Sequence, residues 1–322
     1  MPCVLIAECC QNHNGSLETL KTMIHVAAES GADFVKIQGL RSSELTFRSR
    51  FEHGVVDSDG TVRVITRPFA PELARLSRLD LTDDDEHWFV EECRRAGVKS
   101  MITAFTLGSV SRFSAAGFDA LKIASYDCKS TPLLKEASVF AEVVVSTGAS
   151  YDHEIAAAAA TLSGNQLSLL HCVTIYPTPL NQLHLRRMEW LRSLCPKVGF
   201  SDHTSVEQTG LRASKLAIML GADVVERHFT VLPRDQTRDG PVSIDPSQLV
   251  ELRRFSQLDC TQQEAEMNSE WPEWQMGLGQ MQRELSHGEL LNRDYYSGRV
   301  AAFQDGVQVG SDGITIPERR PD

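Results

Sequence analysis

Short apolar segments alternate with longer helical segments along most of the chain. Residues 4–8 form the first apolar segment, and apolar residues then recur at helical spacing from residue 17 until Gly31. Eight such strand–helix units are predicted before residue 259. Strands that alternate with helices pair in parallel through crossovers, and eight units in about 250 residues favour a closed sheet. The sequence therefore predicts an α/β fold, the (β/α)8 or TIM barrel.

The predicted strands span residues 4–8, 33–38, 99–104, 120–124, 142–146, 167–172, 197–200 and 223–228. The predicted helices span residues 17–30, 83–96, 109–116, 132–140, 152–162, 183–194, 206–220 and 246–257. An open, doubly wound sheet is the alternative architecture. Such a sheet usually carries a glycine-rich phosphate-binding turn after its first strand, and that turn is absent here.

The barrel is expected to occupy residues 1–258 as a catalytic domain, followed by a linker and a short C-terminal tail over residues 259–322. Residues 261–280 are rich in Glu, Gln and Trp and are expected to form a linker or capping segment. Residues 302–322 are polar, contain three glycines and two prolines, and are expected to be irregular.

The chain is acidic, with 43 acidic and 32 basic residues among 322 and a formal net charge of −11. This balance disfavours nucleic acid and anionic membranes as partners, because both attract basic surfaces. The N-terminus lacks the basic region of a signal peptide, and no apolar run has the length of a membrane helix. The eight cysteines include no CxxC pair and are expected to be reduced thiols in a cytoplasmic protein.

Polar residues gather where the predicted strands end, which is where TIM barrels place their active sites. Every predicted strand contributes, through Glu8, Lys36, Gln38, Thr103, Lys122, Ser125, Ser146, Thr147, His171, Ser201, Asp202, His203, Glu226 and His228. A barrel mouth with a purely structural role does not need so many polar groups.

Lys36 and Lys122 lie inside apolar runs, so each must find an anionic partner or lose its charge. One interpretation is a buried lysine–glutamate pair with Glu8 or Glu226. The other is an anion site, because hydroxyls and glycine-released backbone N–H groups near the same rim suit a phosphate or carboxylate. The groups that favour the second interpretation are Ser125, Ser146, Gly148 and Ser201.

His203 and His228 end neighbouring strands, beside Asp202 and Glu226. Two imidazoles on adjoining strand ends can bind one divalent ion and leave positions for water and substrate, although a lone histidine is more often structural. Cys9 and Cys10 follow the first strand without a basic partner nearby in sequence, so they are expected to be core or rim thiols rather than nucleophiles.

Seven motifs resemble, in order and spacing, the sialic acid synthase family, which comprises N-acetylneuraminate, legionaminate and pseudaminate synthases. They are IAECCQNHNG, GADFVKIQ, LKIAS, VVVSTGAS, LLHCVTIYPTP, VGFSDHT and GADVVERHFT, and they cover about residues 1–258. The resemblance implies a barrel that condenses phosphoenolpyruvate with a sugar aldehyde. Phosphate leaves by C–O cleavage, and a 2-keto-3-deoxy sugar acid is formed.

The resemblance also implies a divalent ion held by His203 and His228, with Mn²⁺ expected and Mg²⁺ or Co²⁺ as alternatives. The implied catalytic residues are Glu8, Lys36, Tyr176, Asp127 and Glu226. The implied substrate-binding residues are Lys36, Gln38, Thr103, Lys122, Ser125, Ser146, Gly148, Ser201 and Asp239.

Several positions depart from the family pattern. Tyr126-Asp127 stands where relatives carry Gly-Glu or Pro-Glu, and Arg227 stands where they carry lysine. The family's GPDH stretch is replaced by a segment that begins at Asp239, which is a candidate substitute for its aspartate. Arg299-Val300-Ala301 resembles the opening of the family's C-terminal antifreeze-like domain, and 21 residues follow, so no complete domain is expected.

Two alternatives to this reaction remain. One is a metal-dependent aldolase or lyase that uses pyruvate, and the other is a catalytically silent barrel with a binding role. The changes at Asp127 and Val242 motivate the second. A homodimer is expected because the family dimerises, with Trp271 and Trp274 as candidates for a partly apolar surface on the tail.

Overall fold

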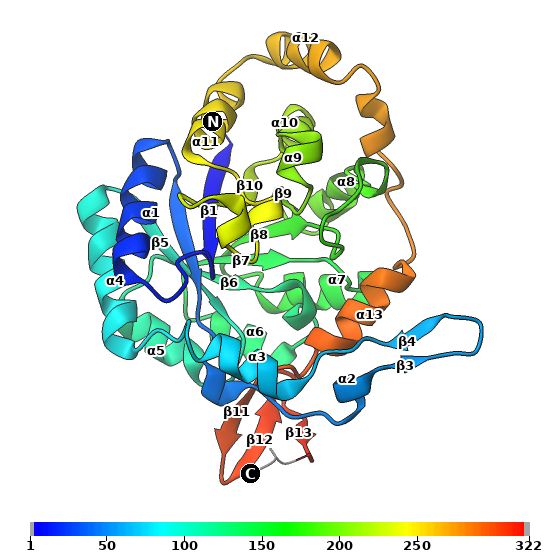
Figure 1. Cartoon of the computed structure of the whole chain (residues 1–322). Coiled ribbons are helices and arrows are strands. Elements are labelled where there is room, and N and C mark those ends of the chain that lie inside the picture. Colours follow the sequence, from blue (N-terminus) through cyan, green and yellow to red (C-terminus); the bar gives the residue numbers. More distant parts are fainter. Residues whose placement is uncertain (1–2, 319–322) are drawn as a thin grey trace.

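The computed structural model describes residues 3–318 and contains a closed barrel of eight parallel strands (Figure 1). The strands pair in the order β1-β10-β9-β8-β7-β6-β5-β2, and β1 closes the ring by pairing with both β2 and β10. The predicted TIM barrel is therefore confirmed. Its strands are β1 Val4–Cys10, β2 Phe34–Gln38, β5 Lys99–Ala104, β6 Ala120–Ile123, β7 Glu142–Ser146, β8 Gln166–His171, β9 Lys197–Asp202 and β10 Val224–His228.

Helices cover the outside of the barrel (Figure 1). They are α1 Leu17–Glu29, α4 Asp83–Ala96, α5 Ser109–Ala116, α6 Thr131–Ala137, α7 Asp152–Thr161, α8 Arg187–Arg192, α9 Val206–Thr209, α10 Arg212–Met219 and α11 Pro246–Ser256. The single helix predicted over residues 206–220 is divided into α9 and α10, because Gly210 adopts a φ of 59° that no helix continues. Over residues 3–318, no helix is both long and apolar enough to cross a membrane.

The interior of the barrel is built in layers. Its lower layer is apolar and consists of Ile6, Phe34, Met101, Ala120, Val144, Leu170 and Val224. Because side chains alternate between the two faces of a strand, the residue two positions further along points into the barrel again, one layer higher. That upper layer contains Glu8, Lys36, Thr103, Lys122, Ser146 and Glu226. The strand period thus places a polar layer at the C-terminal ends of the strands.

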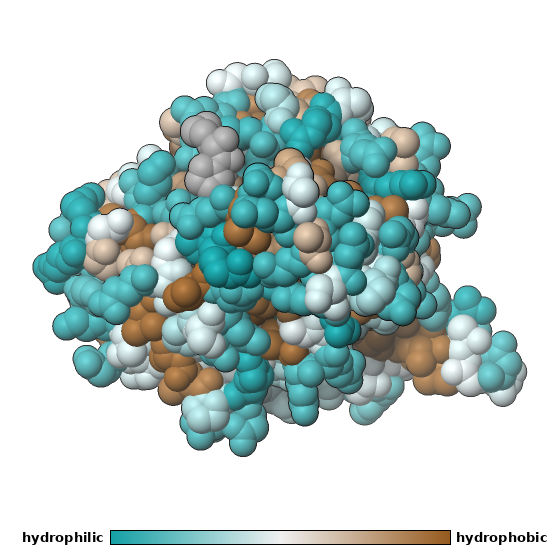
Figure 2. All heavy atoms as spheres, turned by 90° about the horizontal axis from the view of Figure 1, so that it is seen from above, coloured by the Kyte–Doolittle hydropathy of each residue, from teal (hydrophilic) through white to brown (hydrophobic). Residues whose placement is uncertain are grey.

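The larger apolar core lies between the barrel and its helices. Trp271 belongs to this core and is 4% exposed, while Trp274 packs partly against it and donates its indole N–H to Asn268 at 2.8 Å. The expectation of a partly apolar surface on the tail is therefore wrong for Trp271, which is buried, and stays a prediction for the half-buried Trp274. The face seen in Figure 2 is largely hydrophilic, with apolar side chains in scattered groups.

The long polar segment after β2 forms small elements beside the barrel mouth. They are η1 Ser42–Glu44, α2 Arg50–His53, the hairpin β3 Val55–Val56 and β4 Val62–Val64, and α3 Phe69–Leu76. A separate small core holds the segment together through Leu40, Leu45, Phe69 and Leu76. Val300 of the tail joins the same core, so the segment after β2 and the C-terminal tail pack together there.

The tail is more regular than predicted. It contains α12 Cys260–Glu270, η6 Trp274–Gly277, α13 His287–Tyr296, and a three-stranded antiparallel sheet of β11 Ala301–Gln304, β12 Val307–Gly310 and β13 Thr315–Ile316. The expectation of irregular structure is wrong for these strands, and residues 319–322 lie outside the described part. Asp305 and Gly306 both adopt positive φ, which is the backbone of a tight hairpin turn.

Candidate active site

A cavity of about 410 Å³ opens at the C-terminal ends of the barrel strands. It brings together most of the residues singled out in the sequence, namely Glu8, Lys36, Gln38, Thr103, Lys122, Ser125, Ser146, Tyr176, Ser201, His203, Glu226, His228 and Asp239. Asp127 and Gly148 do not line it.

Lys36, on β2, lies on the floor of the cavity between two carboxylates. Its ammonium group pairs with Glu8 of β1, lies 3.6 Å from Glu226 of β10, and donates to Thr103 Oγ1 at 2.9 Å. Burial alone lowers the pKa of a lysine, but Glu226 and Glu8 outweigh it and raise the pKa of Lys36 to about 12. Lys36 is therefore a permanent cation in the barrel.

Lys122, on β6, shares Glu226 with Lys36. Its ammonium group lies 3.2 Å from Glu226 and donates to Ser146 Oγ at 2.8 Å, while Ser201 Oγ donates to Glu226 at 2.8 Å. Burial raises the pKa of a carboxyl group, but Lys122 and Lys36 reverse this and hold the pKa of Glu226 well below its ordinary value. Burial lowers the pKa of Lys122 in spite of Glu226.

The structural interpretation of the two lysines is confirmed, and the anion site stays a prediction. Each is paired with a buried glutamate, as the structural interpretation requires, and each also lines the cavity. The two lysine side chains face two carboxylates, and the hydroxyls of Ser146 and Ser201 lie beside them without adding negative charge. The two carboxylates thus favour the charged form of Lys36, whereas burial prevails over Glu226 at Lys122 and lowers its pKa.

Ser125 packs in a crowded part of the cavity wall next to Gly148 and Cys172. Its hydroxyl lies 3.0 Å from Cys172 Sγ. A Cβ at Gly148 would lie 2.5 Å from Cys172 Sγ, 2.6 Å from Thr174 Cγ2 and 3.0 Å from Ser125 Oγ. Gly148 thus supports the wall of the cavity without lining it, because only glycine allows β7's following loop to approach so closely.

The two histidines predicted to bind a metal face the same cavity, with ring centres 5.6 Å apart. His203 Nδ1 lies 3.2 Å from the Val173 carbonyl, which can only accept, so this nitrogen carries the proton and Nε2 keeps its lone pair. Nε2 lies 3.3 Å from the Tyr176 hydroxyl. Burial, with His228 nearby, lowers the pKa of His203 to about 3, so its imidazole is neutral.

A buried ion pair fixes the strand ends that carry these histidines. Arg227 of β10 pairs with Asp202 of β9 and donates to the Thr204 hydroxyl at 3.0 Å and to its carbonyl at 2.9 Å. Asp202 also accepts from Ser214 Oγ at 2.6 Å. The other carboxylate oxygen of Asp202 accepts from the Thr204 N–H at 2.8 Å, so both oxygens are engaged inside the protein, and Arg227 is fixed next to His228.

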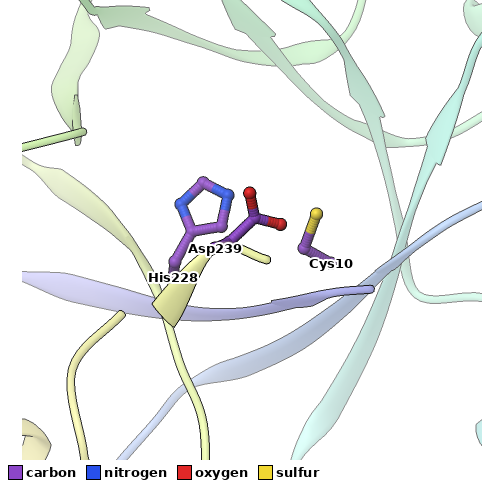
Figure 3. A group of neighbouring side chains, drawn as sticks. All are labelled: Cys10, His228 and Asp239. Carbon is purple, nitrogen blue, oxygen red and sulfur yellow. The ribbon is translucent and has the colours of Figure 1, made fainter. Parts of the chain in front are cut away.

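Cys10, His228 and Asp239 form a cluster at one side of the cavity (Figure 3). The sulfur, one imidazole nitrogen and one carboxylate oxygen all lie within 4.8 Å of one another. Burial, then the neighbouring carboxylates of Asp239 and Glu8, raises the pKa of the Cys10 thiol. Sequence reasoning placed Cys10 in the core or at the rim, and the structure places it in the wall of the cavity.

Arginines from loops and from the tail were not anticipated as cavity residues. Arg67, Arg75, Arg238 and Arg299 line its outer part, together with Gln11, Tyr126, Asn292 and Tyr296. Arg75 lies 2.9 Å from Glu72, Arg238 lies 3.4 Å from it, and Arg299 pairs with it as well. Burial would raise the pKa of Glu72, but the arginines lower it to about 2. Three arginines around one carboxylate leave the outer cavity cationic.

Asp127 was predicted to be catalytic, and the structure corrects this. It is buried away from the cavity and accepts a hydrogen bond of 2.6 Å from Ser311 in the tail. It belongs to the short helix η2 Ser125–Asp127, whose turn carries its side chain to the opposite side from Ser125. His171 also has a structural position, since its Nε2 lies 2.7 Å from the Leu183 carbonyl.

The fold is a barrel with a polar cavity at its mouth, and comparison with known proteins shows that it is an enzyme of the sugar acid synthase class. The chain belongs to the NeuB family, whose model matches residues 23–264, and the predicted resemblance to sialic acid synthases is confirmed. It is 31% identical over 273 residues to the N,N'-diacetyllegionaminic acid synthase of Campylobacter jejuni, covering 80% of this chain and 75% of that protein. It is 27% identical over 286 residues to the pseudaminic acid synthase of Helicobacter pylori, covering 83% and 78%.

A solved structure extends the likeness into the tail. The crystal structure of the spore coat polysaccharide biosynthesis protein SpsE of Bacillus subtilis superposes with a TM-score of 0.66 at 26% identity, covering 91% of this chain and 77% of that one.

Proposed function

We propose that this enzyme condenses phosphoenolpyruvate with a sugar aldehyde to give a 2-keto-3-deoxy sugar acid and inorganic phosphate. One observation carries the proposal: two buried lysines, Lys36 and Lys122, face a cavity of about 410 Å³ that two histidines also line. The reaction needs both features, because one substrate is a small trianionic acid and the other is an aldehyde that must be activated.

The inner half of the cavity suits phosphoenolpyruvate. Lys36 and Lys122 supply positive charge, and the hydroxyls of Ser125, Ser146 and Ser201 lie around them. Charge-assisted hydrogen bonds to phosphate and carboxylate oxygens are stronger than neutral ones, which favours this anion over uncharged sugars at the cavity floor. We assign Gln38 and Thr103 to the same substrate, because both side chains face that floor.

The donor set at the cavity mouth fits a divalent ion. His203 is neutral, its Nε2 lies 3.3 Å from the Tyr176 hydroxyl and carries the lone pair that would hold an ion, and the rings of His203 and His228 lie 5.6 Å apart. When bound, such an ion supplies Lewis-acid polarisation of the aldehyde oxygen. Mn²⁺ is the ion expected from the family, with Mg²⁺ and Co²⁺ as alternatives.

The protein's own side chains would do the remaining work. In the reaction, C3 of phosphoenolpyruvate bonds to the aldehyde carbon, water adds to C2, and the C2–O bond breaks as phosphate leaves. We assign the positioning of this water to Glu8, whose carboxylate is held by Lys36 and by the Cys10 N–H at 2.7 Å. Tyr176 and Asp239 lie on the outer side, where the sugar would bind, and Glu226 holds the two lysines.

We further propose that residues 1–258 form the catalytic domain and that residues 259–322 complete its cavity from outside. Asn292, Tyr296 and Arg299 support this division, because all three come from the tail and line the cavity. All eight cysteines are free, which suits a reducing compartment such as the cytoplasm. A homodimer stays a prediction.

The test is phosphate release from phosphoenolpyruvate on addition of candidate aldehydes, such as N-acetylated hexosamines. The full chain is assayed with Mn²⁺, and the keto acid is identified by its mass. We expect phosphate and keto acid in equal amounts, and neither without aldehyde. A product formed from pyruvate, with phosphoenolpyruvate inert, would replace this proposal with an aldolase. If no aldehyde of the panel gives turnover, the result would favour the alternative of a catalytically silent barrel with a binding role.

A further inference from the structure

Three potential metal ligands converge from three separate segments of the chain. Cys10 is the last residue of β1, His228 is the last residue of β10, and Asp239 precedes the short helix η5 Gly240–Val242. Figure 3 shows the three side chains directed toward one another, and their ligand atoms lie within 4.8 Å. Cys10 and His228 are 7% and 8% exposed, so the cluster is largely shielded from bulk water while it borders the cavity.

An irregular backbone at Cys10 directs its thiol toward His228 and Asp239. The register of β1 against β2 shifts between Glu8 and Cys10, and Cys10 adopts a φ of 46°. Left-handed backbone is unfavourable for cysteine, and such strain persists where surrounding contacts fix it, which is common at functional sites. Here the Cys10 N–H donates to the Glu8 carboxylate at 2.7 Å, so a residue of the polar upper layer of the barrel stabilises the bulge.

The loop that carries Asp239 is equally fixed. Its carbonyl accepts a hydrogen bond of 2.7 Å from Ser243 Oγ, and Ser243 in turn accepts from the Asn12 amide at 2.9 Å. Asn12 also donates to the Phe229 carbonyl at 2.9 Å, next to His228. A Cβ at Gly240 would lie 1.8 Å from the Arg234 carbonyl oxygen, so the loop is closely packed. Ligands held in this way are positioned before an ion arrives.

We propose that Cys10 and Asp239 ligate the same divalent ion as His228, so that the metal centre of this enzyme includes a thiolate. The proposal rests on the metal of the proposed function and adds two ligands to it. His203 is not part of this close group of three, but its ring centre lies 5.6 Å from that of His228 and it lines the same cavity. On binding, the thiol gives its proton to solvent and its sulfur bonds to the ion.

A thiolate changes which ion the site prefers. Sulfur, imidazole and carboxylate together favour Zn²⁺, Co²⁺ or Fe²⁺ over the hard ions Mn²⁺ and Mg²⁺. The thiolate also exposes the centre to oxidation, because a sulfenic acid at Cys10 cannot ligate as a thiolate does. We therefore expect peroxide treatment to release the metal from the wild-type enzyme and thiol reductants to restore binding.

The first test uses Co²⁺ as a spectroscopic probe on metal-free full-length protein, without substrates. We expect one Co²⁺ per chain and a sulfur-to-cobalt charge-transfer band in the near ultraviolet. Cys10→Ser should remove the band and weaken Co²⁺ binding at least about tenfold. Two cysteine variants are controls that should keep the charge-transfer band and the Co²⁺ affinity. They are Cys9→Ala, in the apolar core, and Cys260→Ser, on the exposed surface.

Asp239→Asn should weaken Co²⁺ binding and retain the band, whereas Asp235→Asn, in the exposed part of the same loop, should change neither. If Cys10→Ser fails to fold, X-ray absorption of the wild-type zinc protein answers the question directly. A sulfur neighbour at about 2.3 Å supports the proposal. A first shell of nitrogen and oxygen alone, or a charge-transfer band that survives in Cys10→Ser, overturns it.

These readouts are independent of turnover. If the metal is bound by sulfur but the protein releases no phosphate, the proposed reaction is wrong and the proposed thiolate ligand still stands. If the enzyme turns over but its metal has no sulfur neighbour, the proposed reaction stands and the proposed thiolate ligand is wrong.

Discussion

The ammonium group of Lys122 lies 3.2 Å from both carboxylate oxygens of Glu226 at the centre of the barrel mouth. Removing one partner of a buried pair leaves a charge without compensation, which is costly in a low-dielectric interior. Lys122→Met should lower the free energy of unfolding by roughly 3 kcal/mol, as measured by urea denaturation. It should also weaken phosphoenolpyruvate binding at least about tenfold in calorimetry, because a charged donor is lost.

Lys197→Met, at the exposed start of β9, is the matched control and should leave both quantities within error. Unchanged affinity for phosphoenolpyruvate in Lys122→Met would place this substrate elsewhere in the cavity.

Gly148→Ala should damage the anion site without adding or removing a charge. The new methyl group would lie 2.5 Å from Cys172 Sγ and 2.6 Å from Thr174 Cγ2, so both must move, and we expect Ser125, whose hydroxyl contacts Cys172 Sγ, to shift with them. We expect a loss of about 1–3 kcal/mol in stability from overpacking. We also expect a higher KM for phosphoenolpyruvate with a smaller change in the KM for the aldehyde. Gly164→Ala has no atom within 4 Å of its new Cβ and is the control. Equal effects on both KM values would argue against a specific role for Ser125.

Asp127→Asn should alter the pH dependence of stability rather than catalysis. Burial raises the pKa of Asp127 to about 7 although Ser311 donates to it, so the folded state keeps a proton that the unfolded state loses near pH 4. Its contribution is complete below about pH 4 and declines as pH rises toward about 7, where folding must bury a carboxylate. Urea unfolding at several pH values should show this decline in wild type and a flatter profile in Asp127→Asn.

Parallel profiles for the two proteins would show that Asp127 does not titrate in this way. A large fall in kcat for Asp127→Asn, with stability unchanged, would restore the catalytic role that the sequence suggested.

Arg299→Ala should affect the sugar and spare phosphoenolpyruvate. Arg299 comes from the tail, pairs with Glu72 and lines the outer cavity, beyond the lysines. We expect the KM for the aldehyde to rise about tenfold, as for a lost hydrogen bond to a charged group, while the KM for phosphoenolpyruvate stays constant. Arg63→Ala, in an exposed hairpin pair with Asp57, is the control. A rise confined to phosphoenolpyruvate would place its phosphate among the outer arginines.

The barrel and its inner site could be predicted because one period governs both. An apolar strand residue such as Phe34 implies an inward side chain two positions later, and Lys36 occupies that position. Charged residues in apolar runs are rare enough to identify the cavity floor. Cys10 lies two positions after Glu8 and so has the same strand spacing. The direction of its side chain, however, depends on a bulge and a positive φ, which the hydrophobic pattern of the sequence does not indicate.

The outer site could not be predicted in this way. Arg67 and Arg75 lie in a polar segment without a clear period, and Arg299 reaches the cavity only through tertiary packing. Asp127 was misplaced because a short helix after β6, rather than a strand, determines its direction. The sheet of the tail had a usable signal, since Asp305-Gly306 is a hairpin dipeptide between alternating residues.

The cavity joins residues from opposite ends of the chain, with Glu8 on its floor and Arg299 at its outer edge. During synthesis the barrel strands leave the ribosome well before Arg299 does. A nascent chain that has completed its barrel therefore has the cavity floor and the loop arginines Arg67, Arg75 and Arg238, but lacks the part of the outer wall supplied by Asn292, Tyr296 and Arg299. Under the proposed function, a chain cut between its barrel and Asn292 should therefore bind phosphoenolpyruvate but hold the sugar less tightly.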